Sequence, residues 1–519
     1  MRAMVAMRAM RAMVAMVAMR AMSAGLRVLG RGPAGGLVLA LGAAAALGIS
    51  LAAQQVQEQS IQGAEIKGRA PVSDEVLRVQ LPRAAEADLS GGVHLMVVED
   101  HRAPTISFQL ILQGAGGYYD PPDLPGLAGF TASQMREGTT TRTSLEIAEQ
   151  LDTLAAGVNV GAGLGSQVAT LSGSSLTEDF DRLLTLATDI LLNPTFPQEE
   201  FDRFKTRQRA GLLQQRSNPA FLAGEMFSRV MYGSHPASRV STTLEALDRI
   251  GRDDLVAFHR RTYVPDHAVL GVSGDITLAE ARTKFEAALS TWKKADVDEP
   301  TVADPPVPSS AKVHFVDRPD SVQTSLVVGA PGIDRLDADY DALTVMNYIV
   351  GGGATGRLFL NLREDKGYTY GAYSGFRALR YRGAWQASTD VRTEVTRPAL
   401  QELLGEIARI RDEPVPDREF NDAKRALVAS FALELESPGG ILGDHITRWL
   451  YGLPLEYWDE YPDRIMAITQ TQVQAVARKY LGPSTLQIIA VGDGSRIADV
   501  LDDFGTVDTY DTEGQRTGN

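Results

Sequence analysis

The chain has 519 residues, which is too long for a single ordinary core and fits two or more domains of roughly 150 to 250 residues each. Acidic residues outnumber basic ones by 65 to 51, so a phosphate-binding, nucleic-acid-recognising surface is not expected. The chain contains no Cys, which excludes disulfides, thiolate metal sites, a Cys nucleophile and a lipidated Cys anchor.

Residues 1–53 are predicted to be an export signal behind a spurious N-terminal extension. Residues 1–22 are a near-perfect triplet repeat, MRAMVAMRAMRAMVAMVAMRAM, whose period matches neither helix nor strand, so translation is predicted to start at Met22. Two Arg residues then precede the apolar run GGLVLALGAAAALGISLAA, and small residues allow cleavage near Ala53. The alternative is an uncleaved membrane anchor, because the apolar run approaches spanning length. We expect a soluble mature protein, periplasmic or secreted, with no membrane attachment after cleavage.

Residues 75–295 are predicted to form an N-terminal domain. It opens with two strand patterns, VHLMVVED and TISFQLILQGAGG, in which apolar and β-branched residues cluster or alternate. Residues 126–139, GLAGFTASQMREGT, are expected to form one short helix. An amphipathic helix follows in TSLEIAEQLDTLAAG, where either Thr143 or Ser144 can cap the first turn. Another is predicted in LTEDFDRLLTLATDILLNP, and the domain closes on the buried strand AVLGVSGD.

A proline-rich stretch without hydrophobic period, residues 296–310, is predicted to be a linker to a C-terminal domain at residues 311–505. This second domain also opens with strand patterns, KVHFVD and QTSLVVGAPG, and closes on the buried strand LQIIAVGD.

The two domains are predicted to be copies of one another. The sequence around Phe201 resembles the sequence around Phe420, and the buried strand that ends at Asp275 returns as the buried strand that ends at Asp493. Both pairs are separated by essentially the same distance along the chain, and matches at one offset indicate an internal duplication. Strands mixed with long helices in two copies predict an α+β fold of two homologous domains, each a mixed β-sheet with helices packed on it.

Three segments carry a family resemblance. GGVHLMVVEDHRAPTISFQLILQGAGGYYDPPDLPGLAGF, the 126–139 helix and GGGATGRLFLNLREDKGYTYGAYS together resemble the pitrilysin/insulinase family of zinc peptidases, over nearly all of residues 80–500. In active members the helix carries H-x-x-E-H. Two His four residues apart lie on one helical face and can bind one zinc, while the Glu between them activates the metal-bound water.

In this chain the positions that the resemblance assigns to zinc chemistry hold residues that can neither bind zinc nor activate water. The two His positions hold Gly129 and Ser133, and the Glu position holds Ala132. The acidic third ligand would fall near Ala210 or Gly211, where RQRAGLLQQR has no carboxylate. The seven His residues offer no replacement, since no two stand at ligand spacing on a helix. We therefore expect neither metal nor cofactor in this chain.

The second half has the Arg and Tyr to which the resemblance assigns transition-state stabilisation. In the family, an Arg and a Tyr seven residues later bind the peptide backbone and the oxyanion, and LREDKGYTY supplies Arg363 and Tyr370 at that spacing. Tyr368 is the fallback donor, because it would lie on the same strand face. The alternative is an Arg in a surface ion pair and a structural strand Tyr. GGGATGR, residues 351–357, lacks the ending of a phosphate loop and is interpreted as a tight turn or a close approach to a peptide.

The resemblance implies the metal-free subunit of a two-chain zinc endopeptidase, inactive alone. A homologous partner bearing H-x-x-E-H would hold the zinc, and this chain would add Arg363 and Tyr370 and help enclose the peptide substrate. The alternative is a non-catalytic peptide-binding or scaffold protein of the same family, which would have no need of the pair. A lone active protease conflicts with the missing ligands.

Overall fold

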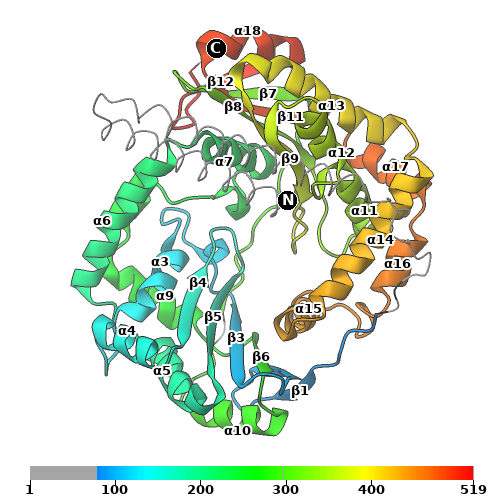
Figure 1. Ribbon diagram of the computed structural model, residues 1–519. Coiled ribbons are helices and arrows are strands. Elements are labelled where there is room, and N and C mark those ends of the chain that lie inside the picture. The colour runs from blue at the N-terminus through cyan, green and yellow to red at the C-terminus, as the bar shows by residue number, and fades with distance from the viewer. Residues whose placement is uncertain (1–76, 78, 296, 518–519) are drawn as a thin grey trace, which may run out of the picture. The chain divides into compact units, whose positions relative to one another are not determined.

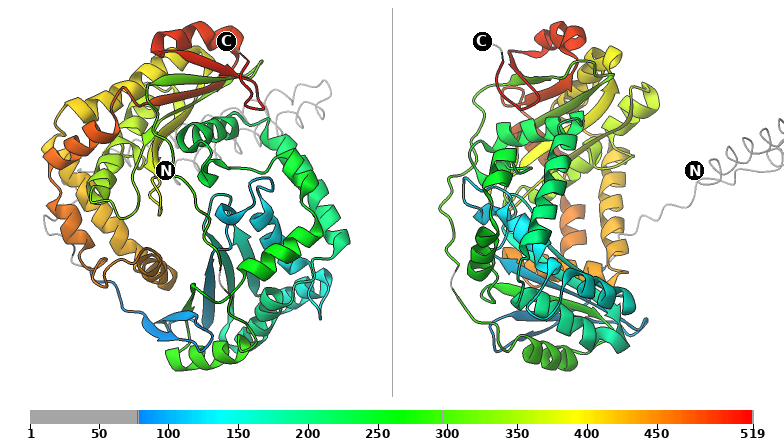
Figure 2. Two further views of the ribbon diagram at one scale, coloured as in Figure 1. Left: turned by 180° about the vertical axis from the view of Figure 1, so that it is seen from behind. Right: turned by 90° about the vertical axis from the view of Figure 1, so that its left-hand side faces the viewer.

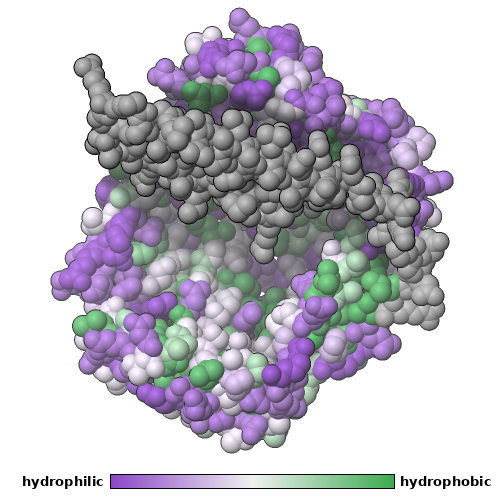
Figure 3. All heavy atoms as spheres, viewed as in Figure 1, coloured by the Kyte–Doolittle hydropathy of each residue, from purple (hydrophilic) through white to green (hydrophobic). Residues whose placement is uncertain are grey.

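The computed structural model describes residues 77, 79–295 and 297–517 (Figure 1), all within one compact unit spanning Val76–Asn519. The predicted export signal, residues 1–53, lies outside the described residues. Within the described part of the chain, no helix combines the length and apolarity that crossing a membrane requires. On the face seen in Figure 3, hydrophilic residues predominate outside the grey region, in keeping with the charged composition.

The described residues form two mixed sheets, as the sequence predicted, and each sheet has six strands. The first has the order β1-β2-β6-β3-β5-β4, with β2 and β6 parallel and the other neighbours antiparallel. Its strands are β1 (Ala85–Asp88), β2 (His94–Glu99), β3 (Thr105–Gln113), β4 (Gly157–Ala162), β5 (Val168–Leu176) and β6 (Ala268–Gly274). The helices of this half are α3 (Leu127–Gln134), α4 (Ser144–Thr153), α5 (Phe180–Leu192), α6 (Gln198–Gln215), α7 (Pro219–Tyr232), α8 (Leu244–Arg249), α9 (Arg252–Thr262) and α10 (Leu278–Ala288).

The second sheet has the order β12-β7-β11-β8-β10-β9, with β12, β7 and β11 parallel and the remaining neighbours antiparallel. Its strands are β7 (Lys312–Asp317), β8 (Gln323–Pro331), β9 (Thr369–Phe376), β10 (Ala384–Arg392), β11 (Gln487–Gly492) and β12 (Val507–Tyr510). The helices of this half are α11 (Tyr340–Gly351), α12 (Arg357–Phe359), α13 (Thr396–Asp412), α14 (Asp417–Glu434), α15 (Pro438–Tyr451), α16 (Tyr461–Ala467), α17 (Gln470–Tyr480) and α18 (Gly494–Leu501).

The duplication is visible in the element bounds. Helices α6 and α14 have the same length, as do α7 and α15, and both pairs are separated by the same offset along the chain. Figure 2 shows α6 in green and α14 in gold. Five strands of the two sheets correspond in order, but the sixth does not: β1 pairs antiparallel with β2, whereas β12 pairs parallel with β7. Strand β12 carries the second sheet beyond residue 505, and residues 297–311 contain no helix or strand.

Each half contributes one helix to the sheet of the other half. In β2, Leu95 and Val97 face the core shared with α5 and α10, while Met96 and Val98 face α15 of the second half. This separation follows from the alternation of side chains along a strand. In the same way α7 of the first half packs on β8 and β11 of the second, where Phe227 lies directly over Gly329. The two halves are therefore interlocked by two exchanged helices.

Local sequence accounts for the helix ends near the site. Thr143 caps α4, because its hydroxyl accepts from the backbone N–H of Glu146 and the Glu146 carboxylate accepts from the backbone N–H of Thr143. The sequence left open whether Thr143 or Ser144 holds the cap, and the structure selects Thr143. Helix α5 ends at Leu192, directly before Asn193 and Pro194.

Candidate functional site

The helix predicted at residues 126–139 is α3, followed by a short 3₁₀ turn over Met135–Glu137. Asp120 fixes its start: one carboxylate oxygen accepts from the backbone N–H of Gly126 and the other from that of Ala128, both at 2.7 Å. Burial raises the pKa of Asp120 to about 6, against the opposing effect of the two backbone donors. Sequence reasoning missed this residue, whose signal is an Asp placed before a Gly-started helix.

The face of α3 that would carry zinc ligands holds no ligand. The exposed Ser133 hydroxyl donates to the Gly129 carbonyl at 2.8 Å, so its partner is a main-chain oxygen and not a base that could activate it. Ala132 is fully buried. A Cβ added to Gly129 would stand 3.1 Å from the carbonyl oxygen of Ala162, at the end of strand β4. The helix therefore packs against β4 where the first ligand would have to project.

The position predicted for the third ligand lies on α6. Ala210 and Gly211 are exposed there, and a Cβ added to Gly211 would meet nothing within 4 Å. Helix α6 contacts α3 through the rings of Phe204 and Phe130, whose centroids are 5.1 Å apart. In the described ranges, no group of three or more His, Asp or Glu side chains is placed to hold a metal ion.

Arg363 and Tyr370 lie on consecutive elements that contact each other, the π-helical turn Leu360–Asp365 and strand β9. The Arg363 guanidinium lies over the Phe359 ring, 4.8 Å from its centroid, and its Nε is 3.5 Å from a Glu364 carboxylate oxygen. Tyr370 is on β9, one of the two edge strands of the second sheet, and 89% of its surface is exposed.

Tyr368 does not lie where the sequence placed it. Strand β9 begins at Thr369, so Tyr368 precedes the strand, and its ring packs against the core of the second half. The preceding turn explains the difference, because Gly367 has φ of 63° and redirects the chain just before the strand. Tyr368 is therefore a packing residue, and Tyr370 is the exposed tyrosine of the pair.

The glycine run at residues 351–357 makes a tight turn against this chain's own strand. A Cβ on Gly351 would stand 2.6 Å from the backbone nitrogen of Ser374 in β9. Arg357, at the end of the run, is buried and makes a bidentate ion pair with Glu419, with nitrogen–oxygen distances of 2.7 and 2.9 Å. The run therefore positions α12 and β9 next to each other.

Comparison with known proteins identifies a family for this chain. Residues 95–240 match the family model described as Insulinase (Peptidase family M16), and residues 249–427 match the model described as Peptidase M16 inactive domain. The chain belongs to the insulinase family. The recognition from sequence is confirmed, and the chain has Gly129, Ala132 and Ser133 at the positions of the family's zinc motif.

Similar proteins include one named as a non-peptidase and others named as zinc proteases. The chain is 26% identical over 369 residues to the non-peptidase homolog YmxG of Helicobacter pylori, covering 70% of this chain and 84% of that protein. It is 24% identical over 379 residues to an uncharacterized zinc protease of Streptomyces coelicolor, covering 71% and 81%. A crystal structure of a peptidase M16 inactive domain from Pseudomonas fluorescens matches with a TM-score of 0.73 and 28% identity, over 79% of this chain and 98% of that one.

Proposed function

We propose that this insulinase-family chain is the metal-free subunit of an exported two-chain zinc endopeptidase. A homologous subunit would supply H-x-x-E-H and the zinc, and this chain would supply Arg363 and Tyr370. The observation that carries the proposal is the exposure of the Tyr370 side chain and its lack of a hydrogen-bond partner among the described residues. Its hydroxyl makes no hydrogen bond within the described residues, and its side chain stands exposed on a free strand edge, available to a group outside the chain.

The contrast between Arg363 and Arg357 supports the same proposal. Arg357 is buried, and its Nε and one terminal nitrogen donate to the two carboxylate oxygens of Glu419, so it serves the structure. Arg363 rests on Phe359 with a single weaker ion pair at 3.5 Å, and its side chain remains one-third exposed. Stacking on an aromatic ring orients a guanidinium while leaving its in-plane donors free. Arg363 is thus held in place with donors to spare for a peptide carbonyl.

In the proposed chemistry, Tyr370 and Arg363 have separate roles. The Tyr370 hydroxyl would donate to the oxyanion that forms at the scissile carbonyl, and a donor aimed at developing charge is worth about 3 kcal/mol of barrier. Arg363 would hold the peptide backbone in both ground and transition states. The zinc in the partner would supply the activated water.

Reconstitution tests the proposal. The purified mature chain is mixed with a homologue from the same source that carries an intact H-x-x-E-H, and cleavage of unstructured peptides is followed with and without a chelator. We expect chelator-sensitive cleavage from the mixture and little from either chain alone. A homologue that cleaves equally well without this chain would leave the proposed role without support.

A second candidate function is non-catalytic peptide binding. Strand β4 is one of the two edge strands of the first sheet, and it lies beside helix α3. An edge strand presents unpaired N–H and C=O groups with which an extended peptide can pair. Saturable peptide binding by the chain alone, with no gain of activity in the mixture, would favour this candidate over the first.

A further inference from the structure

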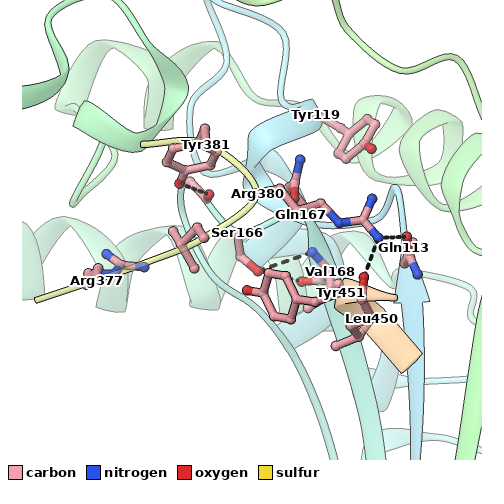
Figure 4. Close-up of a pocket in the computed structure, with 12 residues that line it drawn as sticks. Gln113, Tyr119, Ser166, Gln167, Val168, Arg377, Arg380, Tyr381, Leu450 and Tyr451 are labelled. Carbon is pink, nitrogen blue, oxygen red and sulfur yellow. Dashed lines mark hydrogen bonds between the residues drawn. The ribbon is translucent and has the colours of Figure 1, made fainter. Parts of the chain in front are cut away.

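A pocket of about 160 Å³ lies between the two halves of the chain, at the ends of two edge strands (Figure 4). Strand β4 ends at Ala162, shortly before the loop residues Gly165 and Ser166 that form one wall. Strand β9 ends at Phe376, directly before Arg377 on the opposite wall. The Tyr381 hydroxyl donates to the Gly165 carbonyl at 3.3 Å, which ties the two hairpin tips together beside the pocket.

Arg380 is fixed in this pocket by neutral acceptors from both halves. One terminal nitrogen donates to the Gln113 side-chain oxygen at 3.1 Å and to the Leu450 carbonyl at 2.7 Å. Figure 4 shows the guanidinium held between these two oxygens. Neither acceptor carries a charge, so the positive charge of Arg380 is oriented but not neutralised.

Arg377 adds a second guanidinium whose side chain makes no hydrogen bond or ion pair among the described residues. Burial raises the pKa of the nearby Tyr451 hydroxyl, and the positive charges of Arg335, Arg380 and Arg377 oppose that rise. Arg377 and Arg380, which both line the pocket with Tyr451, therefore act on the same hydroxyl.

A carboxylate of the segment that joins the halves acts on a pocket residue without pairing with the pocket's arginines. Glu299, in the segment that joins the halves, is close enough to raise the pKa of Tyr119, after the larger effect of burial. It forms no ion pair with Arg377 or Arg380 in the part of the chain that the structure describes. In a chain with 65 acidic and 51 basic residues, two arginines that share a pocket without a carboxylate partner are unexpected. The pocket is therefore a local positive site on an acidic protein.

We propose that this pocket binds a carboxylate group of a peptide, either its C-terminus or an Asp or Glu side chain. Guanidinium groups match carboxylate geometry and hold it through charge-assisted hydrogen bonds. The volume is below the roughly 300–1,000 Å³ of sites for drug-sized ligands and suits a single residue. The free edges of β4 and β9 lead to the pocket, and such edges pair with extended peptides. The site is separate from Arg363 and Tyr370, and its occupation needs no partner chain.

Calorimetric titration of the mature chain with three acetylated heptapeptides tests the proposal. One peptide has no acidic residue and a free C-terminal carboxylate, the second is its C-terminal amide, and the third is the amide with one internal Glu. We expect the neutral amide to bind at least about tenfold more weakly than an acidic form, the scale of one charge-assisted contact. Preference for the first or the third peptide identifies the source of the carboxylate. Equal affinity for all three peptides overturns the proposal.

Two variants locate the binding. Arg377→Gln removes a guanidinium whose side chain has no partner in the described residues, so the fold should survive, and affinity for the acidic peptide should fall at least about tenfold. Arg207→Gln is the matched control, because Arg207 is an exposed arginine on α6 away from the pocket lining. Unchanged binding by Arg377→Gln, or an equal loss in Arg207→Gln, contradicts the assignment. Because no second chain is present, these results are independent of whether the reconstituted enzyme is active.

Discussion

A Cβ placed on Gly129 would stand 3.1 Å from the carbonyl oxygen of Ala162, closer than ordinary van der Waals contact. The first position of the zinc motif is therefore occupied by a glycine that lets α3 rest on the end of β4. Ala132, at the position of the catalytic Glu, is fully buried. In this chain the loss of zinc chemistry is accompanied by packing that closes the first ligand position and the position of the catalytic Glu, whereas Ser133 and Gly211 are exposed.

Restoring the motif should not restore the metal. The variant Gly129→His, Ala132→Glu, Ser133→His should bind no stoichiometric zinc, because α6 still lacks a carboxylate third ligand near Gly211. It should also lose about 1–3 kcal/mol of stability, because a bulky group meets Ala162 and a carboxyl group is buried. Elemental analysis after stripping and zinc loading, with thermal melts, measures both. Ser133→His alone, at an exposed position, should melt like the parent; one tightly held zinc in the parent chain would refute the metal-free assignment.

The exchanged helix α7 should be sensitive at its contact with β8. Gly329→Ala would push a Cβ into the Phe227 ring and to within 2.8 Å of the Trp385 carbonyl oxygen, so we expect a loss of about 1–3 kcal/mol. Gly405→Ala, inside α13 with nothing within 4 Å of its added Cβ, should stabilise the protein by up to about 1 kcal/mol. Denaturant unfolding of both variants measures the difference, and equal effects would mean that the α7 contact is loose.

Asp444 should make the protein less stable as the pH rises. Burial raises its folded-state pKa to about 7, helped by the charge of Glu434, and one carboxylate oxygen has no hydrogen-bond partner. The folded chain therefore holds a proton that the unfolded chain releases from about pH 4. Its favourable contribution is complete below pH 4 and is lost as the pH rises to about 7.

Asp444→Asn should accordingly raise the melting temperature more at pH 8 than at pH 4. The gain at pH 8 should be on the order of 1 kcal/mol, after allowance for partial solvent screening. Asp499→Asn, at an exposed position of α18, controls for the loss of one surface charge. A gain for Asp444→Asn that is the same at both pH values would show that the carboxyl group is not strained by burial.

The strands and helices could largely be predicted from local sequence. KVHFVD becomes β7 over the same residues, Lys312–Asp317, because strand alternation and strand burial are local properties. The offset between the sequences around Phe201 and Phe420 reappears in the bounds of α6 and α14. The blank zinc motif is a matter of residue identity at Gly129 and Ser133, which needs no coordinates to be recognised.

Which of these elements pack against each other could not be predicted from the sequence. The apolar face of α7 that carries Phe227 has the same periodicity whether it packs on its own sheet or on the other one, so the helix exchange leaves no local signal. The pocket around Arg377 and Arg380 brings together loops from the two halves that are remote in sequence. The sequence wrongly placed Tyr368 on the same strand face as Tyr370. The alternation of side chains applies only within a strand, and β9 begins at Thr369, one residue after Tyr368.

The start of the mature protein remains a prediction. If residues 1–53 are an export signal, N-terminal sequencing of the native protein should begin near Gln54, and the protein should be in the periplasmic or secreted fraction. Recovery of the intact apolar segment in a membrane fraction would instead support the anchor alternative.

The most direct test of the central claim is the turnover of Tyr370→Phe in the mixture with an H-x-x-E-H homologue. The substitution removes one exposed hydroxyl, so pairing should survive, kcat should fall about 10²-fold and KM should change little. Tyr373→Phe, an exposed tyrosine on the same strand, is the control and should keep full activity. If Tyr370→Phe and Tyr373→Phe both cleave at the rate of the unmodified mixture, Tyr370 does not complete the partner's site and the account is contradicted.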